Sequence, residues 1–263
     1  MRSTLPTYSP AVAADPSPPP DRPSRPSWRR QLTDRDSFVP VLALALLSIV
    51  LFPITDAFRW GGIVAFPVSA ALVLAALHRS KVRPATMRAA VVVLVVVGIG
   101  TVLSSLARIA DIGEDRYLVA LSSFLYALLY AVAFPAIVRR SFQHRRVTTN
   151  TLYAGISAYL IIGIWFGAIF RGISALENYQ FFDKVASPRV GDYIYFSFET
   201  LTTLGYGDLA PVSDAGRTFA ILEAILGQIF LVTAVARIVS LLGSDRSAME
   251  LPGEPELEPA DVD

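Results

Sequence analysis

The residues best suited to chemistry lie between Glu199 and Asp208, in the sequence Glu-Thr-Leu-Thr-Thr-Leu-Gly-Tyr-Gly-Asp. Gly205 and Gly207 alternate with other residues, and glycine adopts left-handed backbone angles without a steric cost. Alternating left- and right-handed angles would turn successive carbonyl oxygens inward, with the Thr203 hydroxyl below them. One chain would then offer a ladder of oxygens, and oxygen atoms are the ligands that hard cations prefer.

The alternative is an ordinary turn, because turns select the same Gly and Asp residues. The flanking sequence favours the oxygen ladder. Residues 190–202 can form a short helix, Pro211 follows the loop, and apolar segments lie on both sides. This order indicates a helix and a loop held inside a membrane, where non-helical backbone is tolerated only if protein buries it or if it lines a water-filled path.

The loop resembles the Thr-Val-Gly-Tyr-Gly filter of the potassium channel family, from which it differs at one residue, and the resemblance covers roughly residues 150–243. It implies a pore made by four identical subunits, with K+ as the permeant ligand and no other cofactor. The filter residues that it assigns are Thr203, Leu204, Gly205, Tyr206 and Gly207, with K+ held at the first four.

The same resemblance assigns the support of the filter. Tyr195 and Phe196 stand where the family often has a tryptophan pair, and Glu199 takes the place of a buried pore-helix glutamate of bacterial relatives. In those relatives the glutamate contacts the aspartate after the filter, here Asp208. Two close carboxylates in a partly dry site cannot easily both ionise, so we expect this pair to share a proton and brace the filter. The alternative for Glu199 is a lone acid that faces extracellular water.

Further positions fall on the expected inner helix. Gly216 and Arg217 match its start in the family, and Gly227 matches the gating hinge. A glycine in mid-helix costs about 1 kcal/mol relative to alanine, which either bending or close packing would explain. Gln228 could face the central cavity. Glu223 is ionisable inside a span, which indicates a functional or paired residue, with simple solvation near the outer end as the alternative.

Composition indicates a membrane protein, since 53% of the residues are hydrophobic and the mean hydropathy is +0.50. The absence of cysteine excludes disulfides and thiolate metal sites. His78 and His144 lie in basic loops and have no companions that would indicate a metal site.

The apolar segments predict an all-α membrane protein with six transmembrane helices and a re-entrant pore helix and filter loop between helices five and six. The segments are 38–55, 60–77, 89–107, 117–138, 151–170 and 218–242. We expect Pro53 and Pro67 to end or kink their helices. The predicted units are a disordered Pro/Arg-rich tail over 1–36, a four-helix module over 37–147, a pore domain over 148–243 and an acidic disordered tail over 244–263.

Charge placement predicts both the orientation and the response to voltage. Basic residues gather before residue 36 and in the segments 79–88 and 139–146, which places both termini in the cytoplasm. A voltage sensor would carry arginines at every third position of its fourth helix, whereas segment 117–138 has no charge. We therefore expect a channel that is not classically voltage-gated.

These observations predict a homotetrameric potassium channel of the plasma membrane that is not an enzyme, contacts lipid and binds no nucleic acid. The tails could bind an unidentified cytoplasmic partner. Two alternatives stay open. Leu204 in place of the more usual valine could make a weakly selective cation channel, and a non-conducting sensor or a transporter could reuse the pore fold.

Overall fold

The structure, a computed structural model, describes residues 37–55, 57–110, 115–142 and 149–247. The predictions for the tail over 1–36 and for residues 248–263 lie outside these residues, as do those for the loop around His144. The helices are α2 (Val39–Thr55), α3 (Gly61–Arg79), α4 (Pro84–Ile109), α5 (Arg116–Phe142), α6 (Thr149–Leu176), α7 (Val190–Leu201) and α8 (Asp214–Ser247). Pairing of extended backbone within the described residues is confined to one bridge between Phe182 and Pro211. The predicted all-α class is confirmed.

Five helices are long and apolar enough to cross a membrane, namely α3, α4, α5, α6 and residues Asp214–Arg237 of α8. Helix α2 is also apolar, but its 17 residues stand at the lower limit of the roughly 17–25 residues that a span requires. The chain is therefore an integral membrane protein with five clear spans and one further apolar helix of marginal length.

Some helix boundaries differ from those predicted. Helix α4 begins at Pro84, so Arg88 lies in the helix and not in the preceding loop. Pro67 lies inside α3, which continues to Arg79, whereas Pro53 lies two residues before the end of α2. Helix α8 continues to Ser247, so the first residues of the predicted acidic tail are helical. Its 34 residues rise about 51 Å, which exceeds the roughly 30 Å of the hydrocarbon core.

The helices share one apolar core across the predicted boundary between the four-helix module and the pore domain. Leu72 of α3, Tyr130 of α5 and Ile161 of α6 are buried in the same cluster. A second cluster surrounds the short helix α7, where the ring of Phe196 meets those of Phe170 and Phe182 edge to face. The outer helix α6 contributes to both clusters, so it joins the module to the pore helix.

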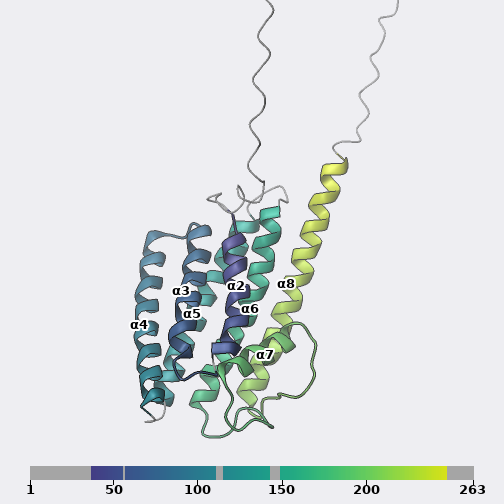
Figure 1. The fold of residues 1–263 in the computed structure, drawn as a ribbon. Helices are drawn as coiled ribbons and strands as arrows, with labels where there is room; N and C mark the ends of the chain where they lie inside the picture. Colours follow the sequence, from purple (N-terminus) through teal and green to yellow (C-terminus); the bar gives the residue numbers. More distant parts are fainter. Residues whose placement is uncertain (1–36, 56, 111–114, 143–148, 248–263) are drawn as a thin grey trace, which may run out of the picture.

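Figure 1 shows that α2 begins and α8 ends at one end of the helical bundle, while α7 and the loops on both sides of it lie at the other end. This arrangement agrees with an even number of crossings. Which end faces the cytoplasm stays a prediction from charge.

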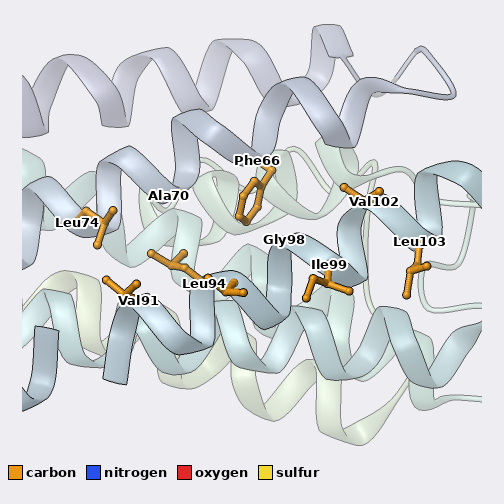
Figure 2. A pocket seen from close by; sticks show the side chains of 10 residues that line it. Phe66, Ala70, Leu74, Val91, Leu94, Gly98, Ile99, Val102 and Leu103 are labelled. Atoms are coloured by element: carbon orange, nitrogen blue, oxygen red, sulfur yellow. The ribbon is translucent and has the colours of Figure 1, made fainter. Parts of the chain in front are cut away.

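An apolar groove of 540 Å³ lies between α3 and α4 (Figure 2). Phe66 projects toward Gly98, where a Cβ atom would come within 2.7 Å of its ring. The neighbouring side chains Val95 and Ile99 of α4 are more than half exposed. Because these helices are long enough to span a membrane, this face is suited to contact with lipid tails.

Candidate functional site

Helix α7 lies where a pore helix was predicted, although it ends at Leu201 with Thr202 as its C-cap. At its start, Asp192 Oδ2 accepts the backbone N–H of Arg189 at 2.7 Å, and a carboxylate near a helix N-terminus is stabilising. The Tyr193 hydroxyl donates to Ser174 Oγ of α6 at 2.6 Å. At the other end, the Tyr159 hydroxyl of α6 donates to the Leu201 carbonyl at 3.1 Å. Both ends of α7 are therefore fixed to the outer helix.

Close backbone approach also positions α7. A Cβ atom at Gly163 of α6 would lie 2.6 Å from the ring of Phe198. At Gly167, a Cβ atom would lie 3.1 Å from Ile194 Cγ1. Small residues at these two positions let the pore helix pack directly on α6.

The loop after α7 has the backbone angles that the sequence predicted. Gly205 and Gly207 have φ of +58° and +72°, and Thr203 also has a positive φ, of +58°. Left-handed angles therefore recur at every second residue from 203 to 207, which turns successive carbonyl groups toward the same side. The positive φ of Thr203 was not predicted, because a β-branched residue rarely adopts it and a strained position of this kind costs about 1–3 kcal/mol.

Glu199 holds this loop from behind. Its side chain is 4% exposed, and its Oε1 accepts the backbone N–H of Tyr206. The Glu199 carbonyl also accepts the N–H of Leu204 at 2.9 Å. The burial contradicts the alternative of a lone acid that faces water. The glutamate supports the filter as expected, but by a direct bond to the filter backbone.

The predicted carboxylate pair of Glu199 and Asp208 requires correction. Asp208 is exposed and accepts the Tyr195 hydroxyl at 3.2 Å through Oδ2, while its Oδ1 accepts the N–H of Leu209 at 3.1 Å. No hydrogen bond joins the two carboxylates within the described subunit, because Glu199 is already turned inward to Tyr206. Tyr195, which the sequence assigned to filter support, is therefore the residue that holds Asp208.

Lys184 is a filter contact that sequence reasoning missed. Its ammonium group donates to the Gly207 carbonyl at 2.9 Å from the loop between α6 and α7. The sequence carries no periodic signal for this contact, because it spans 23 residues of loop and helix. A positively charged group is thus hydrogen-bonded to one carbonyl oxygen at the end of the loop.

The segment that leaves the filter is tied back to the loop before α7. Asp183 N–H donates to the Ala210 carbonyl at 3.1 Å, and Val212 N–H donates to the Phe181 carbonyl at 2.9 Å. Arg217, at the start of α8, donates its Nε–H to the Pro211 carbonyl at 3.0 Å. These bonds fix the exit of the filter relative to both neighbouring helices.

Glu223 lies behind the pore helix and is fully buried, which contradicts the alternative of simple solvation. Its Oε1 is hydrogen-bonded to Ser197 Oγ of α7, and Ser197 Oγ is also 2.6 Å from the Gly163 carbonyl of α6. A serine hydroxyl has one hydrogen and a carbonyl has none to give. Both bonds can form at the same time only if the carboxyl group of Glu223 carries a proton and donates it to Ser197, and a neutral Glu223 would then link three helices.

Gly227 of α8 packs against the end of the pore helix. A Cβ atom there would lie 2.4 Å from Leu201 Cδ1 and 3.4 Å from the Leu201 carbonyl. Close packing therefore accounts for this glycine, and the gating hinge stays a prediction. The neighbouring Gln228 is exposed in the single subunit, as a residue lining a central cavity would be.

The filter residues have few contacts inside their own subunit. Leu204 and Tyr206 are 54% and 69% exposed. Within the described residues no three His, Cys, Asp or Glu side chains gather in a metal-binding group. The oxygen atoms available to a cation here are therefore the backbone carbonyls of the loop and the Thr203 hydroxyl, which suit an alkali cation better than a transition metal.

Known proteins match this part of the chain. Residues 156–244 match the model of an ion channel family. The voltage-gated potassium channel Kch of Escherichia coli is 31% identical over 114 residues, which are 42% of this chain and 25% of that protein. The calcium-gated potassium channel TvoK of Thermoplasma volcanium is 47% identical over 49 residues, or 19% of this chain and 14% of that protein. Protein LctB of Geobacillus stearothermophilus is 32% identical over 107 residues, or 38% of this chain and 78% of that protein.

The chain thus spans a quarter or less of the length of the two named channels. No solved structure matches it significantly. Helices α7 and α8, with the loop of left-handed backbone angles between them, lie within the matched residues and define an ion channel protein. More narrowly, the chain belongs to the potassium channel family.

Proposed function

We propose that the chain is one subunit of a homotetrameric channel that passes K+ passively through four copies of the loop over residues 203–207. The observation that carries this proposal is the recurrence of left-handed φ at Thr203, Gly205 and Gly207. Such angles give a column of carbonyl oxygens, which is how potassium channels replace the hydration shell of the ion. K+ is then the permeant ligand, held between Thr203 and Tyr206, and the protein has no enzymatic activity.

Two features of the subunit support assembly around a central axis. The filter side chains Leu204 and Tyr206 are exposed, and so is an apolar face of α8 that includes Ile221, Ile225 and Ile229. A single column of carbonyl groups cannot enclose an ion, so neighbouring copies must provide the remaining oxygens. We propose that they also cover these side chains, with the C-terminal end of α7 directed at the central cavity, where its partial negative charge favours a cation.

The four helices before the pore are not a voltage sensor in this proposal. Helix α5 has basic residues only in its first and last turns. Both termini lie in the cytoplasm of a cell whose plasma membrane holds the channel, and any partner of the tails is cytoplasmic. The name of the Escherichia coli relative refers to voltage gating of that protein, of which this chain matches a quarter.

The test is reconstitution of the full-length protein in lipid bilayers, with reversal potentials measured under opposed K+ and Na+ gradients. A reversal potential near the K+ equilibrium value supports the proposal. A value between those of the two ions supports the weakly selective channel, which Leu204 would explain. Saturable flux without single-channel steps indicates a transporter, and the absence of flux in correctly assembled protein contradicts conduction altogether.

A further inference from the structure

The last carbonyl group of the filter loop is hydrogen-bonded to a cation that belongs to the protein itself. The ammonium nitrogen of Lys184 lies 2.9 Å from the carbonyl oxygen of Gly207. Gly207 has a φ of +72° and is the last of the three left-handed residues of the loop. A lysine ammonium group is a compact monovalent cation with three N–H donors. It therefore presents to this oxygen the same charge as a K+ ion.

The backbone before Lys184 is held in a fixed place beside the filter exit. Phe182, which is fully buried, pairs with Pro211 in an antiparallel bridge. The next residue, Asp183, donates its N–H to the Ala210 carbonyl at 3.1 Å. Paired antiparallel segments run in opposite directions, so each step from Phe182 toward Lys184 leads back along the exit segment to the filter loop. The fold of this segment thus directs the lysine side chain at the last filter carbonyl.

Two acidic residues, Asp183 and Asp208, are the chain neighbours of Lys184 and Gly207. Asp208 accepts the Tyr195 hydroxyl at 3.2 Å. Among the described residues, neither aspartate forms an ion pair with Lys184, whose ammonium contact is the one to Gly207. Both carboxylates attract cations to this end of the loop, and they do so equally whatever residue stands at position 184. A comparison of variants at this position therefore isolates the effect of the ammonium group.

We propose that the Lys184 ammonium group competes with the permeant ion at the end of the filter and so sets how much K+ is needed to fill it. The proposal rests on the proposed channel function. The K+ positions proposed above end at Tyr206, and the oxygen just beyond them is the one that Lys184 contacts. An ion on that oxygen would lie about two bond lengths from the ammonium nitrogen, well within the Debye length of about 8 Å. Repulsion between the two charges disfavours simultaneous occupancy.

The competition affects the two directions of ion flow differently. A K+ ion that arrives from the pore-helix end meets the ammonium group first and must displace it from the Gly207 carbonyl. An ion that arrives through the central cavity has already entered the filter when it reaches this oxygen. Current that enters from the pore-helix end at low K+ concentration is therefore the flow that Lys184 limits most.

The test uses the purified full-length protein and two measurements. In detergent, thermal unfolding is followed while KCl replaces N-methylglucamine chloride at constant ionic strength, which gives the K+ concentration for half-maximal stabilisation. In bilayers, the single-channel current that enters from the pore-helix end is measured over the same range of K+ concentration.

The variants separate charge from side-chain length. Lys184→Met and Lys184→Gln remove the charge, whereas Lys184→Arg retains it. The matched control is Arg189→Gln, which removes one positive charge from the end of the same loop. Among the described residues, Arg189 forms no hydrogen bond with the filter loop.

We expect Lys184→Met and Lys184→Gln to lower the K+ concentration for half-maximal stabilisation and for half-maximal current by at least about threefold. Repulsion between two unit charges at this separation has about that effect even at the dielectric constant of water. Lys184→Arg and Arg189→Gln should stay near the parent. A merely structural role of Lys184 would lower the unfolding temperature at every K+ concentration without moving the midpoint.

Equal midpoints in the parent and in Lys184→Met, or weaker K+ binding in that variant, would overturn the proposed competition. A Lys184→Arg protein that behaves like Lys184→Met would overturn it too, because the charge would then not be the cause. A parent protein that passes no current contradicts the channel function instead, and the thermal titration still decides whether Lys184 opposes K+ binding.

Discussion

Gly205 has a φ of +58°, and no atom lies within 4 Å of the position that a Cβ atom would take there. Any effect of Gly205→Ala would therefore come from the backbone angle and not from a steric clash with a neighbour in the same subunit. We expect this substitution to abolish K+ current, because an L-residue resists the left-handed angle by about 1–2 kcal/mol at each of the four filter copies.

Gly155→Ala is the matched control for the measurement. Gly155 lies in α6, has no positive φ, and an added Cβ atom would meet nothing within 4 Å. Single-channel recordings in bilayers compare the two variants with the parent. Unchanged K+ current and unchanged K+/Na+ selectivity in Gly205→Ala would contradict the role of this backbone.

Glu199 offers a second test at the residue scale. Glu199→Ala leaves the Tyr206 N–H without its buried acceptor, which we expect to destabilise the filter by about 1–3 kcal/mol and to shorten the time for which it stays conductive. Glu199→Gln should do less harm, since an amide oxygen can accept the same hydrogen. Mean open time and inactivation are measured in both. Equal loss in the two variants would show that the accepting oxygen is not what matters.

Glu223 is tested by comparing a neutral isostere with a truncation. If the carboxyl group is protonated, Glu223→Gln should retain thermal stability to within about 1 kcal/mol, whereas Glu223→Ala should cost about 2–4 kcal/mol through the lost bond and the cavity left behind. An infrared carbonyl band of a carboxylic acid should be present in the parent and absent from Glu223→Gln. A parent spectrum without that band would show that the group is ionised.

At the scale of helices, α7 depends on contacts that a local pattern does not encode. Its existence and length followed from sequence, because a short helix before Thr-Leu-Gly-Tyr-Gly is a local signal. Some of the contacts that hold α7 and the filter loop in place were not predicted. The bond of Glu223 to Ser197 joins residues 26 positions apart, and Lys184 reaches Gly207 from an irregular loop. The error on Glu199 and Asp208 has the same origin, since sequence adjacency to the filter does not fix which way a side chain turns.

The contact between α8 and α7 distinguishes packing from bending at Gly227. Gly227→Ala would place a Cβ atom 2.4 Å from Leu201 Cδ1, and Leu201 is fully buried. We expect a loss of about 1–3 kcal/mol in stability through overpacking, with partial recovery in the double variant Gly227→Ala, Leu201→Val. Thermal unfolding measures both. Undiminished stability together with a lower open probability would instead favour the hinge.

At the scale of the whole molecule, the all-α class and the order of the long apolar helices were predictable because long apolar segments are separated by polar loops, whereas the sixth span stays a prediction, since α2 is of marginal length. The ends of the helices were less predictable. Helix α4 begins at Pro84, and α8 continues to Ser247, past the expected boundary. Polar residues can continue a helix beyond the membrane, so the end of an apolar segment does not fix the end of the helix. The joint core of the module and α6 could not be predicted, because composition does not tell which of several apolar faces meet.

The absence of a charge ladder leads to the last expectation, which concerns voltage. Helix α2 contains no charged residue, and in α5 the charges are confined to Arg116, Arg139 and Arg140 at its ends. Moving one elementary charge through 100 mV provides about 2.3 kcal/mol, so a module without mobile charges in mid-membrane gains little from the field.

The open probability should therefore change only slightly with voltage, with an apparent gating charge below about one per subunit. The innermost basic residues at the pore-helix end, Arg108 and Arg171, are half-buried. Replacing either with glutamine should leave the voltage dependence as shallow as in the parent. Gating-current recordings with several elementary charges per subunit would show instead that these four helices move charge through the membrane.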